Sequence, residues 1–367
     1  HNPVIIIFTM NDFSNSKTVE IDGRLIGPNQ PTYFVAEAGL NHNTDIKLAK
    51  KLIDEAKGCG ADAVKFQTYK AANLCTKSAP KYWDDDNENE TQYDVFKKLD
   101  SFEKDDWRQI FEYARSKQVT CFSTPFDKES VELLYSLDVP AFKIASADIT
   151  AIPLIKQIAS KKLPIFISTG MASDEEINDA INTIEEQGNN QIVIMHCITS
   201  YPTKPEDANL EIIHRLVKKY PDYVIGYSDH TIGTTIPVYS TFYGAKCIEK
   251  HFTYDNHLKT SPDHWLSLNT EGFKQLVNEL KISQISKGSE SRVEFDSERE
   301  AVKFARRSIV SKAKIPKGVK ITQEMLDIKR PGIGVPPKYF DKIIGSVALN
   351  DIEDDVPIMW KDVDFKP

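Results

Sequence analysis

Short apolar runs alternate with longer amphipathic stretches along the chain from about residue 33 onward. The short runs are rich in β-branched residues, as buried strands are, whereas the longer stretches repeat apolar residues at helical spacing. Eight short runs have this character, at residues 33–38, 62–68, 119–124, 141–146, 165–169, 192–197, 224–228 and 246–252. Eight strands that alternate with helices predict an α/β fold, a closed (β/α)8 TIM barrel.

The stretches between the runs predict an outer ring of helices. Residues 45–57 place Ile46, Ala49, Leu52, Ile53 and Ala56 at helical spacing, and a Ser-x-x-Glu capping box at residue 173 starts a helix that runs to residue 184. After residue 68 the rhythm breaks, because a long polar stretch that includes residues 83–90 precedes the next predicted helix at 105–117. Long βα loops commonly cover active sites.

Both ends of the chain are predicted to lie outside the barrel. Residues 1–30 form an N-terminal extension whose β-hairpin, at 19–26 around Asp22-Gly23, would plug the barrel floor. The barrel takes residues 31–286, with its last helix at 270–286, and a charged linker takes 287–303. Residues 304–367 have short strands and many turns but no long helical period, which predicts a small, mostly β domain.

Composition narrows the classes of partner. The net charge of −8 leaves no basic excess to neutralise a nucleic-acid backbone. No segment approaches the roughly 18 apolar residues that a membrane span needs. The five cysteines are odd in number and widely spaced, so we expect reduced core thiols. Together these features predict a cytoplasmic protein without nucleic-acid or membrane partners.

Polar residues interrupt the apolar runs near their carboxyl ends, where barrel enzymes place their chemistry. They include Glu37, Lys65, Gln67, Thr124, Lys143, Ser146, Ser168, His196, Ser228, His230, Glu249 and His251, with Thr199 and Tyr201 just beyond the sixth run. Two lysines and several hydroxyls suit a phosphate and a carboxylate, because each anion needs positive charge and hydrogen-bond donors. His230 and His251, on adjacent strands, could chelate a divalent metal. Taken singly, each lysine is also explained by an ion pair and each histidine by a hydrogen-bonded core imidazole, so the prediction depends on their joint occurrence.

Ten short motifs occur in the order found in the sialic acid synthase family, which includes legionaminate and pseudaminate synthases. They are AEAGLNH at 36–42, VKFQT at 64–68, FSTPF at 122–126, FKIAS at 142–146, STGM at 168–171, YPT at 201–203, YSDH at 227–230, IEKHF at 248–252, SPDH at 261–264 and KRPG at 329–332. The chain resembles this family from about residue 31 to residue 364.

The resemblance implies a reaction and an assembly. The barrel would be followed by a domain similar to type III antifreeze protein, the SAF domain, which would cap the partner's barrel in a domain-swapped homodimer. Phosphoenolpyruvate would condense with N-acetylmannosamine or a related amino-sugar aldehyde to give N-acetylneuraminate and phosphate, with N,N'-diacetyllegionaminate or pseudaminate as the alternative product. A divalent metal, Mn²⁺ or else Mg²⁺ or Co²⁺, would assist.

The resemblance also implies roles for single residues. His230 and His251 would hold the metal, and Glu37 would handle a proton. The phosphate and carboxylate of phosphoenolpyruvate would be held by Lys65, Gln67, Thr124, Lys143, Ser146, Ser168, Thr199 and Ser228. Tyr201 and the catalytic Asp263 would contact the open-chain sugar, and Arg330 from the partner's cap would reach its N-acyl group.

Three positions depart from the common family pattern. Asp148 stands where a glutamate is usual, and Thr199 where an asparagine is frequent. Ile333 replaces the asparagine that usually follows Arg-Pro-Gly in the cap. The acceptor sugar is therefore the least specified part of the function, although Arg-Pro-Gly leans toward the sialate or legionaminate side over pseudaminate.

Two other functions are compatible with parts of the pattern. A Schiff-base aldolase would use Lys65 or Lys143 as its nucleophile, but the paired histidines argue against it. A catalytically inactive barrel with a binding role is the second, since a fold alone does not guarantee activity. The intact set of polar strand ends argues against a decayed site.

Overall fold

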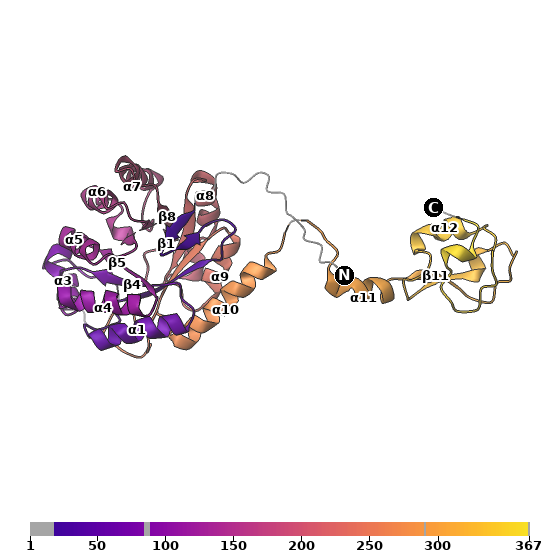
Figure 1. The fold of residues 1–367 in the computed structure, drawn as a ribbon, viewed down its shortest axis with the longest axis horizontal. Coiled ribbons are helices and arrows are strands. Elements are labelled where there is room, and N and C mark those ends of the chain that lie inside the picture. Colours follow the sequence, from indigo (N-terminus) through magenta and orange to yellow (C-terminus); the bar gives the residue numbers. More distant parts are fainter. Residues whose placement is uncertain (1–17, 84–88, 290, 366–367) are drawn as a thin grey trace. The chain divides into compact units, whose positions relative to one another are not determined.

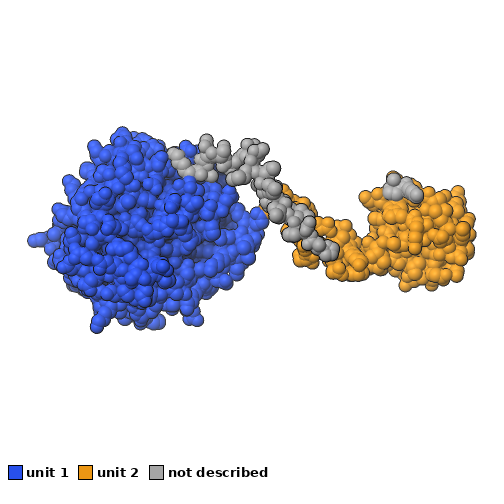
Figure 2. Space-filling model, viewed as in Figure 1, with its two compact units in different colours: residues 1–288 blue, residues 289–367 orange. Residues whose placement is uncertain are grey.

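The computed structural model describes residues 18–83, 89–289 and 291–365 (Figure 1). The chain divides into two compact units, residues 1–288 and residues 289–367, which Figure 2 draws in different colours. The division falls two residues after the predicted end of the barrel. Each unit has its own buried apolar cluster.

Unit 1 is a closed barrel of eight parallel strands, so the predicted fold class is confirmed. The strands are β3 (Tyr33–Gly39), β4 (Ala63–Thr68), β5 (Thr120–Pro125), β6 (Phe142–Ile144), β7 (Ile165–Ser168), β8 (Ile192–Cys197), β9 (Val224–Asp229) and β10 (Cys247–His251). They neighbour one another in chain order, and β10 closes the barrel against β3. The largest difference from the predicted runs is at β6, where the chain leaves the strand and forms a 3-10 helix, η1 (Ser146–Asp148).

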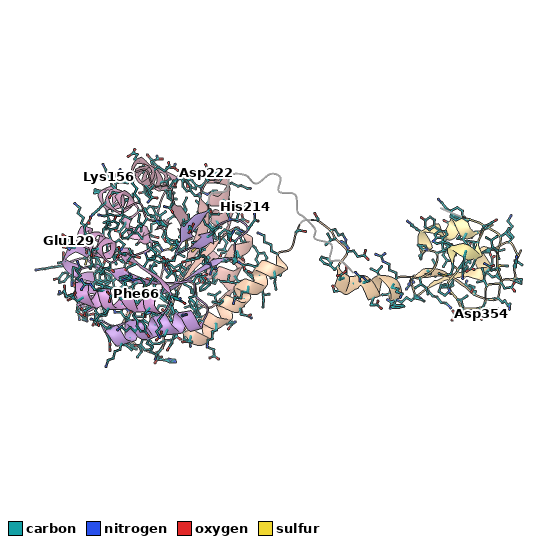
Figure 3. All side chains as sticks on the ribbon, in the orientation of Figure 1. Phe66, Glu129, Lys156, His214, Asp222 and Asp354 are labelled. Carbon is teal, nitrogen blue, oxygen red and sulfur yellow. The ribbon has the colours of Figure 1, made fainter. Side chains whose placement is uncertain are left out.

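Helices surround the barrel. They are α1 (Ile46–Gly58), α4 (Lys104–Ser116), α5 (Lys128–Ser136), α6 (Ile152–Ser160), α7 (Asp174–Glu186), α8 (Glu211–Lys219), α9 (Thr235–Phe242) and α10 (Thr270–Ser286). Ser173 begins α7 with the predicted capping box, and Asp45 caps α1 by accepting a hydrogen bond from the Lys47 amide. Figure 3 shows the result for side chains: Phe66 lies inside unit 1, whereas the exposed Glu129 and Lys156 lie at its edge.

A β-hairpin precedes the barrel, formed by β1 (Val19–Ile21) and β2 (Arg24–Ile26). Asp22 and Gly23 both have positive φ, which the tight turn between right-twisted strands requires. Buried hairpin residues share one apolar cluster with inward-facing residues at the start of the barrel strands, which are Tyr33, Val35, Ala63, Phe122, Ala141, Phe166, Val193, Met195, Val224 and Cys247. The hairpin therefore closes the amino-terminal end of the barrel and leaves the carboxyl end for the site.

The long loop after β4 contains two short helices, α2 (Ala71–Leu74) and α3 (Gln92–Lys97). Residues 84–88 of the predicted acidic stretch lie outside the described residues. Tyr82, Trp83 and Phe96 line the cavity at the carboxyl end of the barrel. The loop thus borders the site, as predicted for a long βα connection.

Unit 2 is small and mostly β. Its elements are η3 (Asp296–Glu298), α11 (Arg299–Phe304), β11 (Ser308–Ser311), η4 (Gln323–Met325), β12 (Leu326–Lys329), η5 (Pro337–Tyr339), α12 (Phe340–Ile343) and η6 (Trp360–Asp362). β11 and β12 pair antiparallel, and isolated bridges such as Ile315 with Ile352 extend the pairing. The predicted linker at 287–303 is not extended throughout, because its last part forms η3 and most of α11.

Two predictions from composition can be compared with the structure. All five cysteines lie in the described part of the chain and are unpaired; four are buried and Cys75 is half-buried. None of the helices within the described ranges combines the length and the apolar character that a membrane span requires.

Candidate active site

A cavity of about 1040 Å³ opens at the carboxyl end of the barrel strands. Each of the eight strands contributes to its wall, through Glu37, Lys65, Thr124, Lys143, Ser168, Cys197, Ser228 and Glu249. The other predicted site residues of the barrel also line it, namely Gln67, Ser146, Thr199, Tyr201, His230, His251 and Asp263. Arg330 is exposed on unit 2, directly after β12, so its contribution to this cavity stays a prediction.

Four buried charges of alternating sign form a row at the bottom of the cavity. Lys65 Nζ lies 2.6 Å from Glu37 Oε2 and 3.7 Å from Glu249 Oε1. Lys143 Nζ donates to both oxygens of Glu249, at 2.9 and 2.8 Å. The row is completed by hydrogen bonds from Gln67 to Glu37 and from Lys65 to Thr124. Both lysines are therefore held in place by buried carboxylates.

The two carboxylates of this row differ in acidity. Burial raises the pKa of Glu37 to about 7, against the lowering effect of Lys65. Burial also opposes ionisation of Glu249, but Lys143 and Lys65 outweigh it and lower the pKa of Glu249 to about 2. Glu249 is thus a permanent anion at neutral pH, whereas Glu37 can gain and lose a proton there.

Hydroxyl groups beside the lysines are left without partners. Ser168 Oγ and Thr199 Oγ1 are buried, and neither has a hydrogen-bond partner among the described residues. Ser146 Oγ accepts from the Gly170 amide at 3.0 Å. A Cβ on Gly170 would come within 2.4 Å of Thr199 Oγ1 and 2.7 Å of Ser146 Oγ, so glycine keeps this corner open. Because unpaired buried hydroxyls cost free energy, the corner fits a ligand rich in acceptor oxygens.

His230 and His251 lie side by side in the cavity wall, with ring centroids 5.3 Å apart. His230 Nδ1 donates to the Ile198 carbonyl oxygen at 2.8 Å, which leaves Nε2 free as a ligand. His251 Nδ1 is buried, has no hydrogen-bond partner among the described residues, and lies 3.9 Å from Asp263 Oδ2. Burial lowers the pKa of His251 well below its usual value, which keeps the imidazole neutral, as a metal ligand must be.

The two imidazoles fit a catalytic metal better than a structural one. Within the described ranges, no cluster of three or more His, Cys, Asp or Glu side chains could surround an ion. A catalytic ion, however, keeps coordination positions open for substrate and water. Two imidazole nitrogens suit a divalent first-row transition-metal ion, whose other positions would be filled by water or substrate oxygens in the cavity.

The outer part of the cavity is more apolar. Tyr201 covers His230, with ring centroids 4.2 Å apart. Tyr82, Trp83, Phe96, Leu258 and Trp265 line the mouth. Asp263 lies beside His251, and burial raises the pKa of Asp263 to about 6. This half of the cavity combines apolar surface with a few polar groups, which is typical of small-molecule sites.

Comparison with known proteins adds a family to this geometry. A model of the NeuB family matches residues 52–292, and a model of the SAF domain matches residues 306–364. The chain belongs to the NeuB family. The predicted resemblance is confirmed.

Curated and solved NeuB relatives match over nearly their whole length. The N,N'-diacetyllegionaminic acid synthase of Legionella pneumophila is 37% identical over 358 residues, which cover 96% of this chain and 99% of the relative. The N-acetylneuraminate-9-phosphate synthase of Homo sapiens is 32% identical over 93% of this chain and 95% of its own. The crystal structure of N-acetylneuraminic acid synthetase from Leptospira borgpetersenii, in complex with citrate, superposes with a TM-score of 0.70 at 33% identity and covers 78% of this chain and 96% of that one. These relatives are sialic-acid-type synthases, so the chain is an enzyme of this family.

Two positions that depart from the common NeuB pattern lie in the cavity wall. Asp148 Oδ2 is buried without a hydrogen-bond partner among the described residues, and burial raises the pKa of Asp148 to about 6. Thr199 presents the unpaired hydroxyl described above. Both positions therefore place a buried polar atom without a partner among the described residues in the cavity wall.

Glu249 is the residue that the analysis of the sequence missed. The ion pair that explains each lysine taken singly is present, and Glu249 is a partner of both Lys65 and Lys143. Alternation along a strand gives the missing signal, because Glu249 lies two positions before His251 and therefore faces the same side. His196, by contrast, is one of the polar residues predicted at the strand ends but is absent from the described cavity lining. It donates to the Ala208 carbonyl oxygen at 2.8 Å.

Proposed function

We propose that this NeuB enzyme condenses phosphoenolpyruvate with an N-acylated amino-sugar aldehyde and releases a nonulosonic acid and phosphate. The observation that carries the proposal is the arrangement of one cavity. Two buried lysines and several hydroxyls line this cavity together with two neighbouring imidazoles. The first group suits a phosphorylated carboxylic acid, and the second suits a metal-assisted carbonyl reaction.

Phosphoenolpyruvate would bind across the charged row. Lys65 and Lys143 would turn from Glu37 and Glu249 toward the phosphate and carboxylate, supported by Gln67 and by the hydroxyls of Thr124, Ser146, Ser168, Thr199 and Ser228. Ser168 and Thr199 would gain the partners that they lack. Ser228, which donates to Glu249 at 3.1 Å, would change partner together with the lysines.

The metal site would consist of His230 and His251, with Mn²⁺ as the proposed ion and Mg²⁺ or Co²⁺ as alternatives. A bound divalent ion would supply Lewis-acid polarisation of the acceptor's carbonyl oxygen. Asp263 and Tyr201 would orient the open-chain sugar beside the imidazoles. Tyr201 would also exclude water, because its ring covers His230.

The reaction forms one carbon–carbon bond and, at C2, exchanges the carbon–oxygen bond to phosphate for one to a water oxygen. C3 of phosphoenolpyruvate attacks the aldehyde carbon, and the aldehyde oxygen takes up a proton. Water then adds at C2, and phosphate leaves with the bridging oxygen, so that the water oxygen becomes the C2 ketone. Of the two water protons, one balances the proton taken up by the aldehyde oxygen and the other leaves on phosphate. Glu37 is placed to handle the proton, since burial raises its pKa to about 7 and its carboxyl can act as acid or base at neutral pH.

The acceptor is proposed to be a 2,4-diacetamido trideoxy sugar or N-acetylmannosamine, in preference to a sugar phosphate. Apolar side chains of the lining, such as Trp83, Phe96 and Trp265, would contact acetyl and deoxy positions, although the basic Lys98 and Lys259 line the same cavity. The Legionella relative is named for the diacetyl product, and the Leptospira structure for N-acetylneuraminic acid. The two unphosphorylated acceptors are equally consistent with these relatives.

A domain-swapped homodimer is also proposed, with the SAF domain of a second copy over the mouth and its Arg330 on the N-acyl group. Met171, Ile232 and Trp265 support it, because these exposed apolar residues follow the carboxyl ends of three different strands. Sedimentation of a monomer at working concentration would remove this part of the proposal.

The unpaired cysteines fit a reducing compartment such as the cytoplasm.

Phosphate release is the experiment that tests the function. Purified protein with Mn²⁺ and phosphoenolpyruvate is offered N-acetylmannosamine, its 6-phosphate and the diacetamido sugars in parallel. We expect release that depends on one unphosphorylated acceptor and is abolished by EDTA and by His230→Ala. His214→Ala, on the exposed face of α8, is the matched control and should keep full activity. Absence of release with every acceptor would refute the proposal and favour a binding role.

A further inference from the structure

A buried ion pair lies behind the two predicted metal ligands. Lys250 Nζ lies 2.6 Å from Asp229 Oδ2, and both side chains are fully buried. Asp229 ends β9 and immediately precedes His230, while Lys250 lies on β10 and immediately precedes His251. The ion pair therefore links the two residues that directly precede the histidines.

Strand geometry places the ion pair and the histidines on opposite sides of the barrel wall. Asp229 and Lys250 are direct register partners in the parallel pairing of β9 with β10. Successive side chains of a strand point to opposite faces, and Glu249 and His251 line the cavity. Neither Asp229 nor Lys250 is among the described residues of that lining. The pair thus faces the helices and does not meet substrate.

The same pair also fixes the turn that carries His230. Asp229 Oδ1 accepts from the Thr231 amide at 3.0 Å and from the Tyr227 hydroxyl at 2.9 Å. Asp229 Oδ2 accepts from the Thr231 hydroxyl at 3.0 Å, and Lys250 Nζ donates to the Thr231 carbonyl oxygen. The residues on both sides of His230 are therefore tied to β10, the strand that carries His251.

Stability alone gives little reason for such a pair. Compared with apolar side chains of the same volume, a buried ion pair is often neutral or unfavourable, because desolvation offsets the attraction. What a satisfied pair does provide is a fixed separation of the two strands that it joins. Metal affinity depends on ligands being held in place before the ion arrives.

We propose that Lys250 and Asp229 are positioning residues that hold His230 and His251 at the separation needed to bind a divalent metal. The inference rests on the metal site of the proposed function and adds two residues that touch neither metal nor substrate. It assigns no role to their titration. The relevant quantity is the placement of the two rings, whose centroids are 5.3 Å apart.

The test is metal binding by the full chain without substrate. Asp229→Asn combined with Lys250→Met removes both charges and keeps the side-chain volumes similar. We expect a folded protein, by circular dichroism and thermal melting, whose Mn²⁺ dissociation constant rises by about 10- to 100-fold. The concentration of free Mn²⁺ is measured by electron paramagnetic resonance. The visible spectrum of bound Co²⁺ should change as well, because it reports the arrangement of the ligands.

A matched control is available on the other side of the barrel. Thr68 and Ser123 form a buried hydroxyl pair, 2.7 Å apart, between β4 and β5, and neither precedes a histidine. Thr68→Val with Ser123→Ala should leave Mn²⁺ affinity unchanged. Thr231→Val, which removes one hydrogen bond and keeps the ion pair, should weaken Mn²⁺ binding several-fold and covers the case in which the double variant does not fold.

The outcomes separate this inference from the function on which it rests. Wild-type affinity in the folded double variant, or equal weakening in the control pair, would overturn the positioning role. If the double variant does not fold, unchanged Mn²⁺ affinity in Thr231→Val would overturn it too. A wild-type protein that binds no Mn²⁺, with His230→Ala making no difference, would instead refute the metal site itself.

Discussion

At the scale of single residues, charge balance organises the cavity. Lys65 and Lys143 share Glu249, and Lys65 also pairs with Glu37, so each buried cation has a buried anion beside it. Such a row is stable only as a whole, because removal of one member leaves an unpaired charge in a low-dielectric environment. In the proposed function, a substrate anion would enter this row by exchanging places with a carboxylate.

Glu249 makes the stability of the protein depend on acid pH. Its folded pKa of about 2 lies below the ordinary 4.5, so its stabilising contribution is present above pH 4.5 and is lost as the pH falls toward 2. In Glu249→Gln, we expect the free energy of unfolding to decrease less than in wild type as the pH falls through this window, by up to about 3 kcal/mol. Urea midpoints measured from pH 2 to pH 6 test this. The exposed Glu129→Gln is the control, and parallel curves for wild type and Glu249→Gln would contradict the expectation.

At the scale of elements, the ends of the strands and the turns after them make the site. β7 ends at Ser168, and the turn at Gly170 brings the backbone against Ser146 and Thr199, which follow β6 and β8. The three turns form one corner because parallel strands present their carboxyl ends on the same side. A glycine is needed where they meet.

Gly170→Ala tests this corner. The new methyl group would displace the hydroxyls of Thr199 and Ser146, so we expect the KM for phosphoenolpyruvate to rise at least tenfold while Mn²⁺ affinity stays unchanged. Gly58→Ala is the matched control, since a Cβ there meets nothing within 4 Å. Gly58 ends α1, where alanine should be neutral or slightly stabilising. An unchanged KM for phosphoenolpyruvate in Gly170→Ala would show that its phosphate does not bind at this corner.

At the scale of the whole molecule, two units with separate cores share one proposed function. Unit 2 packs Ile309, Ile315, Leu326, Val335 and Ile358 into its own cluster. The barrel carries all predicted site residues but one, and that one, Arg330, lies on unit 2. In the proposed function, unit 2 therefore contributes only to recognition of the acceptor. The groups proposed for chemistry all belong to unit 1.

Arg330→Ala tests that division. We expect the KM for the acceptor to rise by about tenfold or more, as for a lost charge-assisted hydrogen bond of about 1.5–3 kcal/mol, with the KM for phosphoenolpyruvate unchanged. Lys329→Ala, which removes an exposed ion pair with Asp355, is the neighbouring control. Steady-state kinetics with each substrate varied in turn decide the matter. Equal effects on both KM values would contradict a role confined to the acceptor.

The sequence alone determined the barrel, because hydrophobic periodicity and capping residues such as Ser173 act locally and leave a readable pattern. The sequence also placed the strand-end residues at one end of the barrel, because parallel strands run in the same direction. Only the tertiary structure decided which of these residues touch. That Glu249 bridges two lysines, that Ser168 and Thr199 lack partners, and that Lys250 with Asp229 supports the histidines all depend on contacts between different strands. No local pattern encodes such distances, because they are fixed when the barrel closes and its side chains pack.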